Sequence, residues 1–194
     1  ADIIIVGIKS DGDIHPDVDI SKIGGKGVFC KLIEQELFWG NIDVAVHSLK
    51  DMPGEENPAL CVHGVLERND YRDVLVGKVF EGAVIGTSSP RRTAQMLDVF
   101  SNLRVQVKKI RGNVDTRIKK LQSGEYDAIV LAKAGLDSLN IDINYDELTI
   151  IPAIGQGIIA MQTRNDDFEL NKIIKQINHE ETFKQAKLER ALLK

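Results

Sequence analysis

A membrane-spanning stretch, a cluster of cysteines and a strong net charge are all missing from this 194-residue sequence. Its longest apolar runs, such as ADIIIVGI at residues 1–8, are far shorter than the roughly 20 residues that a membrane-spanning helix needs. The two cysteines, Cys30 and Cys61, lack the spacing of a metal site, so we expect buried free thiols in a reducing cytosol. We therefore expect a cytoplasmic protein without membrane contact and without a metal.

The sequence also lacks a surplus of basic residues, and aromatic side chains are scarce. The formal net charge is −4 and aromatic residues make up 5% of the chain, which argues against a general nucleic-acid-binding protein and against base stacking. With 43% hydrophobic and 28% charged residues, the composition is typical of a soluble globular protein with one large domain or two smaller ones. No signal peptide is visible, and the chain starts without Met on a strand-like run, so we expect its true N-terminus to lie outside this sequence.

Apolar runs that alternate with amphipathic segments indicate an α/β fold. Strands are expected within residues 2–8, 42–48, 59–66, 83–89, 103–110, 128–132 and 148–157. Helices are expected from 28 to Gly40, at 90–100, 113–122 and 133–139, and from Asp166 onward with a break near Asn178. Such alternation is typical of βαβ units with a mainly parallel sheet, in which ligands bind beyond the carboxyl ends of the strands.

Two glycine- or lysine-bearing stretches in the first third of the chain are candidates for ligand binding. SKIGGKG at 21–27 places Lys22 and Lys26 among glycines before a helix, which suits an anion, although a mobile surface turn would look the same. VAVHSLKDMP at 44–53 places Lys50 and Asp51 directly after a buried strand. The pair is either a solvated ion pair or a functional one, in which Lys50 holds an acidic group and Asp51 steadies positive charge or moves a proton. His47 favours a structural role, because no serine nucleophile elbow accompanies it.

Two helix starts carry arginines where the helix macrodipole is already positive. In GTSSPRR, residues 86–92, a serine cap and a proline are followed by Arg91 and Arg92, and IRGNVDTR at 110–117 repeats the pattern with Arg111 and Arg117. Ordinary surface arginines would explain each helix start singly but not the recurrence, which favours an anion site. Gln156 in PAIGQG suits either a hinge or an amide contact to a ligand. The cations at strand exits together favour a small polyanionic ligand over nucleic acid.

The sequence also resembles a known family, that of porphobilinogen deaminase (hydroxymethylbilane synthase). The motifs GGKGVF, DVAVHSLKDMP, ERNDYRD, GTSSPRR, RGNVDTR, GEYDAIVLAKAGL, PAIGQG and NHEET occur in that family's order, from about residue 9 to the end. The resemblance implies an α/β fold of two periplasmic-binding-protein-like domains with a central cleft. Domain 1 would be residues 1–66 plus 158–178, domain 2 would be 67–157, and 179–194 would begin a third, α+β domain that is otherwise absent.

The resemblance further implies a transferase of tetrapyrrole, or haem, biosynthesis. The family condenses four porphobilinogen molecules head to tail into hydroxymethylbilane and releases ammonia at each step. It works on a dipyrromethane cofactor that is bound covalently to a cysteine of the third domain, a residue not present in this chain. The implied partner is the small molecule porphobilinogen, with no nucleic acid and no membrane, and the implied state is a monomer in the cytoplasm.

Functional residues are carried over position by position from the matching motifs. Asp51 would be the catalytic carboxylate, which stabilises the azafulvene-like cation left when ammonia departs and assists proton transfer. Cofactor-binding positions would be Asp13, Lys50, Thr87, Ser88, Ser89, Arg91, Arg92, Gly135 and Gln156. Substrate-binding positions would be Lys22, Lys26, Arg111 and Arg117, with the two lysines in a mobile loop over the cleft.

The sequence departs from the family's pattern in several places. The N-terminal strand with the motif TR.S.LA and the GGC segment with the cofactor cysteine are not found, and Ser138 stands where the family usually has an arginine. Cys30 and Cys61 do not replace that cysteine, because they are expected within a helix and a strand. We therefore expect this chain to be inactive by itself. The alternative function is a non-catalytic binding protein for a small acidic solute, which would have no use for Asp51.

Overall fold

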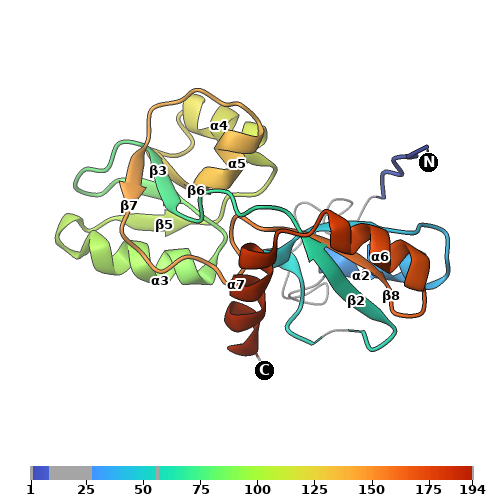
Figure 1. The fold of residues 1–194 in the computed structure, drawn as a ribbon. Helices are drawn as coiled ribbons and strands as arrows, with labels where there is room; N and C mark the ends of the chain where they lie inside the picture. Colours follow the sequence, from blue (N-terminus) through green and yellow to red (C-terminus); the bar gives the residue numbers. More distant parts are fainter. Residues whose placement is uncertain (1, 9–27, 56, 194) are drawn as a thin grey trace. The chain divides into compact units, whose positions relative to one another are not determined.

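The computed structural model describes residues 2–8, 28–55 and 57–193, and its chain forms two compact units. The first unit comprises Ala1–Asn69 and Ile158–Lys194, and the second unit comprises Asp70–Gly157. Figure 1 shows that each unit combines a β-sheet with helices, so the predicted organisation as two α/β units is confirmed. None of the helices in these described ranges has the length and apolar character needed to cross a membrane.

The sheet of the first unit has three strands in the order β1-β8-β2, which are Ala45–Ser48, Ile159–Arg164 and Leu60–Val65. Helix α2 (Val28–Phe38) covers one face, and its Glu34 accepts a hydrogen bond from Gln162 of β8. Helix α6 (Phe168–Gln176) covers the other face, where its Asn171 bonds the next residue of β8, Thr163. Successive residues of a strand point to opposite faces, so β8 is covered on both sides, whereas the edge strand β1 leaves Val46 and Ser48 exposed.

Helix α7 (Glu180–Ala191) also packs within the first unit. Its Ala186 lies in one buried cluster with Val65 of β2, Ala160 of β8 and Cys30 of α2. The break between α6 and α7 falls at residues 177–179, as the sequence predicts. The assignment of residues 179–194 to a third domain stays a prediction.

The second unit has a five-stranded sheet in the order β5-β4-β6-β3-β7. The strands are Gln106–Lys108, Val84–Gly86, Ala128–Ala132, Asp73–Gly77 and Asp146–Leu148. Helix α3 (Pro90–Val99) lies on one face, while α4 (Val114–Gln122) and α5 (Lys133–Ser138) lie on the other (Figure 1). Alternate residues of β3 point to opposite faces of the sheet. Leu75 packs against Met96 of α3 in one buried cluster, and Val74 packs with Ile118 of α4 in another.

The expected mainly parallel sheet is wrong. Within the described ranges only the pairings of β4 with β5 and with β6 are parallel, and the other four are antiparallel. The antiparallel pairings all involve β3 or β8, two strands that the sequence reading did not identify. Each begins just after the chain passes from one unit to the other, so neither belongs to a βαβ repeat that would fix its direction.

Two segments that the sequence predicts as strands are not strands. Residues 2–8 pair with no other strand of the described chain, and the side chains of residues 2–7 are exposed. Of residues 148–157 only Leu148 belongs to a strand, the end of β7. The backbone of Ile151 is bonded instead to side chains of α3, because its N–H donates to Gln95 Oε1 and its carbonyl accepts from Arg91 and Gln95. Side-chain partners therefore replace a neighbouring strand there.

Candidate functional site

Three of the predicted site residues, Asp13, Lys22 and Lys26, lie outside the described residues. The others fall into two groups, one in each unit. Lys50 and Asp51 lie in the first unit, and the remaining nine predicted positions lie in the second. We describe each group by itself.

Lys50 and Asp51 lie in a short 3-10 helix, η2 (Leu49–Asp51), directly after β1. Leu49 anchors this turn, since its side chain is buried in the core and its N–H donates to Ile158 O at 2.9 Å. With Leu49 turned inward, Asp51 is exposed and Lys50 is half-buried. The sheet thus presents a carboxylate and an ammonium group side by side at the end of β1, an edge strand whose residues are alternately buried and exposed, so the expected buried strand is wrong.

His47 lies on the same strand but belongs to a buried polar network. Its Nε2 is 3.1 Å from Gln162 Oε1, and Gln162 in turn donates from Nε2 to Glu34 Oε1 at 2.9 Å. Burial lowers the pKa of His47 more than this hydrogen bond raises it, so the imidazole is neutral at physiological pH. The contacts favour the structural role that the sequence predicts.

Both cysteines are free thiols, as predicted. Cys30 is buried in α2, and burial, together with the charges of Glu34 and Asp51, raises the pKa of its thiol to about 12. A thiol needs to ionise to act as a nucleophile, so Cys30 is unreactive. Cys61 is half-buried in β2, and its Sγ donates to Val62 O at 3.6 Å. The described residues also contain no group of three or more acidic, histidine or cysteine side chains that could hold a metal ion.

In the second unit, the loops that follow β4 and β5 lie side by side. The two strands are parallel neighbours, so their carboxyl ends share one edge of the sheet. Thr87 N donates to Lys108 O at 2.9 Å, and Ser88 Oγ donates to Ile110 O at 2.6 Å. The structure therefore brings the GTSSPRR motif next to the IRGNVDTR motif, the adjacency that parallel strands predict. Gly135, in α5 after β6, lies against Val114 at the start of α4.

Helix α3 begins with a side-chain cap. Ser89 Oγ accepts a hydrogen bond from Arg92 N at 3.4 Å, Pro90 is the first helical residue, and Thr87 Oγ1 accepts from Ser89 N at 3.2 Å. A hollow of about 370 Å³ borders this start and is lined by Thr87, Ser88, Lys109 and residues of α3. The hydroxyl groups are thus largely engaged in shaping the loop.

Helix α4 begins in the same manner. Asn113 Oδ1 accepts from Thr116 N at 3.0 Å, and the preceding Gly112 has a φ of +105°, a conformation that favours glycine. Arg117 Nε donates to Gly112 O at 2.8 Å, which holds the arginine against its own loop. Arg111 and Arg117 are both half-buried.

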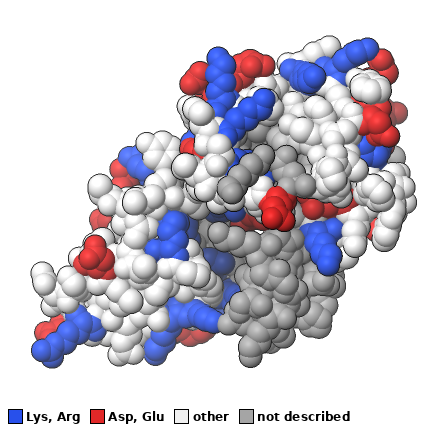
Figure 2. Space-filling view, turned by 90° about the horizontal axis from the view of Figure 1, so that it is seen from below, with Lys and Arg blue, Asp and Glu red and all other residues white. Residues whose placement is uncertain are grey.

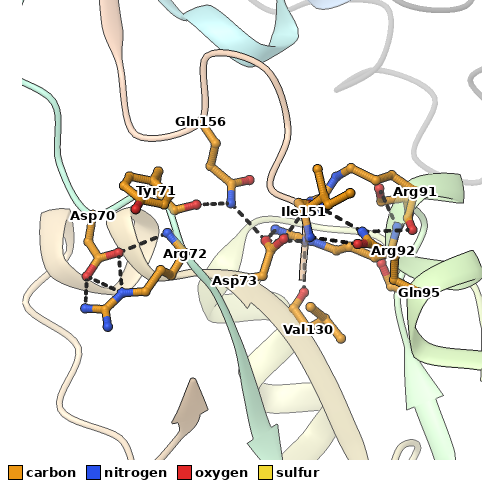
Figure 3. Close-up of polar contacts among 12 residues, drawn as sticks. Asp70, Tyr71, Arg72, Asp73, Arg91, Arg92, Gln95, Val130, Ile151 and Gln156 are labelled. Atoms are coloured by element: carbon orange, nitrogen blue, oxygen red, sulfur yellow. Dashed lines mark hydrogen bonds and ion pairs between the residues drawn. The ribbon is translucent and has the colours of Figure 1, made fainter. Parts of the chain in front are cut away.

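Asp73, a residue that the sequence reading did not identify as functional, lies at the centre of the arginine cluster. Figure 3 shows its carboxylate between the amide of Gln156 and the guanidinium groups of Arg91 and Arg92. Burial raises the pKa of Asp73, but the charges of Arg92 and Arg91 and the Gln156 hydrogen bond hold it below its ordinary value. The available signal was an acidic residue directly before the apolar run VLV, which places a carboxylate at the mouth of a buried strand.

Charged side chains of both signs are scattered over the surface seen in Figure 2. Figure 2 shows Lys and Arg side chains interspersed with Asp and Glu on that face, in keeping with the net charge of −4. Part of the acidic and basic surface is engaged in ion pairs, such as those of Arg72 with Asp70 and with Glu147.

Comparison with known proteins decides the family. A family model described as porphobilinogen deaminase, dipyrromethane cofactor binding domain, matches residues 1–172. The chain belongs to the porphobilinogen deaminase family. The porphobilinogen deaminase of Geobacillus kaustophilus is 48% identical over 198 residues, covering 96% of this chain and 63% of that protein. The porphobilinogen deaminase of Syntrophomonas wolfei is 43% identical over 197 residues, covering 96% of this chain and 64% of that protein.

The resemblance that the motifs indicate is therefore confirmed, and the chain spans less than two thirds of the length of these porphobilinogen deaminases. Among solved structures, a TRAP periplasmic solute binding protein from Desulfovibrio salexigens aligns with a TM-score of 0.49 at 12% identity. That alignment covers 87% of this chain and 63% of the other, a likeness too weak to establish anything further.

Proposed function

We propose that this chain forms part of an enzyme that condenses four porphobilinogen molecules head to tail into hydroxymethylbilane and releases ammonia at each step. The observation that carries the proposal is Asp51, an exposed carboxylate beside Lys50 in the turn that follows β1, in a chain of the porphobilinogen deaminase family. The proposed enzyme is a cytoplasmic monomer that acts on a small molecule and binds neither nucleic acid nor membrane.

Asp51 would stabilise positive charge and transfer a proton during the reaction. Loss of ammonia from the substrate leaves positive charge on the ring that reacts, and a fixed carboxylate stabilises that charge. The same carboxylate accepts a proton when the ring regains its neutral form. The buried Leu49 beside it supports this role, because an anchored turn holds the carboxylate in place without a rearrangement during the reaction.

The basic residues would hold the carboxylates of substrate and cofactor. When bound, the dipyrromethane supplies the growing end to which each new ring is joined. Its acetate and propionate groups fit the guanidinium groups of the second unit, where Arg91 is partly exposed and Arg111 and Arg117 are half-buried. Within the described chain, the buried Cys30 thiol, with its pKa of about 12, does not fit the covalent attachment.

The alternative, a non-catalytic binding protein for a small acidic solute, has no observation in its favour. An exposed carboxylate weakens the binding of an acidic ligand by charge repulsion, so a pure binding protein gains nothing from Asp51. The same carboxylate is what a reaction with a developing positive charge requires.

The test compares Asp51→Asn with the unchanged full-length gene product. We expect the intact mass of both to exceed the sequence mass by one dipyrromethane adduct, and we expect kcat for porphobilinogen to fall by about 10²–10⁴-fold in the variant. Glu55→Gln serves as the matched control, because Glu55 is an exposed carboxylate a few residues later in the same loop. It should leave kcat unchanged. Normal turnover by the Asp51→Asn variant would refute the proposal. So would an unchanged full-length protein that binds porphobilinogen but does not turn it over.

A further inference from the structure

Asp73 carries a buried charge that the proposed chemistry does not use. It is the first residue of β3, and β3 runs antiparallel to β6, with Asp73 paired to Ala132 at the carboxyl end of β6. The carboxyl ends of β4 and β6 share that edge because the two strands are parallel. A residue at the beginning of β3 therefore reaches the loop and helix start that follow β4.

The carboxylate of Asp73 has three partners: Arg92 and Gln156 donate hydrogen bonds to Oδ1, and Arg91 forms an ion pair with Oδ2. Arg92 donates to Oδ1 from Nε at 3.0 Å and from Nη2 at 2.6 Å, and Arg91 Nη2 lies 2.7 Å from Oδ2. Gln156 Nε2 donates to Oδ1 at 2.9 Å and to Tyr71 O at 2.7 Å (Figure 3). The Asp73 side chain is fully buried, that of Arg92 is 8% exposed and that of Arg91 is 24% exposed. Exposure thus increases from the carboxylate outward to Arg91.

We propose that Asp73 is the positioning residue of this site: it fixes both guanidinium groups at the first turn of α3 and leaves one net positive charge for one carboxylate of the bound ligand. This inference rests on the proposed function, in which Arg91 and Arg92 hold cofactor carboxylates. Two guanidinium groups and one carboxylate sum to a single positive charge, which matches a carboxylate better than a doubly charged phosphate. Two unneutralised arginines on adjacent residues would repel each other and the positive end of the helix.

Gln156 acts through Asp73 in this arrangement. Both protons of its amide are donated within the second unit, to Tyr71 O and to Asp73 Oδ1. The amide therefore orients the carboxylate rather than the ligand. Gln156 therefore supports the arginines through Asp73, whereas the resemblance implies that it contacts the cofactor directly.

The test measures the charge selectivity of the site. The probes are acetate and inorganic phosphate, each titrated into the full chain. NMR follows the Nε–Hε signals of Arg91 and Arg92, which the variants Arg91→Lys and Arg92→Lys assign. In Asp73→Asn, which keeps the side-chain shape but removes the charge, we expect the ratio of phosphate to acetate affinity to rise at least about tenfold.

Asp70→Asn is the matched control. Asp70 lies on the same segment and forms an ion pair with Arg72 at the surface, so its replacement removes an equal charge from the unit but not from the cluster. It should leave the selectivity ratio unchanged. Equal ratios in Asp73→Asn and the unchanged chain, or equal shifts in the two variants, would overturn the assignment.

A measurement on the unchanged chain covers the case in which Asp73→Asn does not fold. Arg92 Nε–H, bonded to the buried Asp73, should exchange with solvent at least about tenfold more slowly than Arg72 Nε–H, which is bonded to Asp70 at the surface. Equal exchange rates contradict the proposal. If the proposed function is wrong, the unchanged full-length product carries no dipyrromethane adduct. If only this inference is wrong, the unchanged full-length product carries the adduct and the Asp73→Asn variant retains it equally well.

Discussion

Replacing Arg92 by methionine should destabilise the second unit by about 3–5 kcal/mol, the usual cost of removing one partner from a buried ion pair. The change removes the hydrogen bonds from Nε and Nη2 to Asp73 Oδ1, at 3.0 and 2.6 Å, and the bond from Nη1 to Val130 O at 3.0 Å. Methionine fills a similar length of side chain, so the loss is chiefly electrostatic. Asp73 stays fully buried, with only Arg91 and Gln156 to stabilise its charge.

The size of this loss should depend on pH, and its sign follows from the pKa of Asp73. Burial raises that pKa, and Arg92, Gln156 and Arg91 together lower it below the ordinary value. A carboxyl group with a lowered pKa contributes stability above its unfolded-state pKa of about 3.9, and this contribution is lost as the pH falls through the folded-state pKa. Without Arg92, only Gln156 and Arg91 are left among these groups to oppose the effect of burial, so we expect a higher pKa for Asp73, and protonation relieves the buried charge. The difference between the two proteins should therefore shrink as the pH is lowered from about 7 to about 4.

Urea unfolding provides the assay. All three tyrosines, Tyr71, Tyr126 and Tyr145, lie in the second unit and the tryptophan, Trp39, lies in the first, so near-UV circular dichroism in a Trp39→Phe background reports on the second unit. Arg72→Met is the matched control, because Arg72 is one residue before Asp73 and its ion pairs with Asp70 and Glu147 are exposed. If Arg92→Met costs no more than Arg72→Met, or if its cost grows as the pH falls, the reasoning about this cluster is wrong.

Two further predictions concern the thiols and the loop before α4. In the native protein iodoacetamide should alkylate Cys61 well before Cys30, because Cys30 is buried and its pKa is raised to about 12; peptide mapping that finds Cys30 labelled first would contradict this. Gly112→Ala should cost about 1–3 kcal/mol in urea unfolding, since φ is +105° and a Cβ would lie 2.6 Å from Thr116 Cγ2. Gly124→Ala, at a φ of +79° with open space around it, should cost less, and equal costs would rule out the clash.

Helix α4 could be predicted from the sequence because one apolar face defines it. Val114, Ile118 and Leu121 of α4 recur at helical spacing, and all three pack in the same core cluster. The central strand of the first unit, β8, could not be predicted in the same way. In β8, Gln162 and Thr163 are fully buried and polar, so no apolar alternation marks the strand, and their hydrogen bonds go to residues far away in the sequence.

The candidate site likewise contains residues that local motifs predict and one residue, Asp73, that depends on the path of the chain. The exposed Asp51 directly after β1 follows from a local motif, and the adjacent arginine loops follow from the parallel pairing of β4 with β5. The antiparallel entry of β3 depends on the path of the chain between the two units, and no local pattern encodes it. Local patterns therefore do not identify Asp73 as a site residue, although it belongs to the motif ERNDYRD.

A basic helix start requires a negative charge nearby, and the two helix starts of this protein obtain it from different places. Helix α4 has Asp115 in its own first turn, which offsets the positive end of the helix beside Arg117. Helix α3 has no acidic residue in its first turn, and its counter-ion is Asp73, nineteen residues before Arg92 and on another strand. A helix whose first turn is basic and lacks its own acid therefore points to a carboxylate contributed by the sheet. In an α/β unit that carboxylate belongs at the edge where the helix begins, and the first residue of an antiparallel strand is a position from which it can reach.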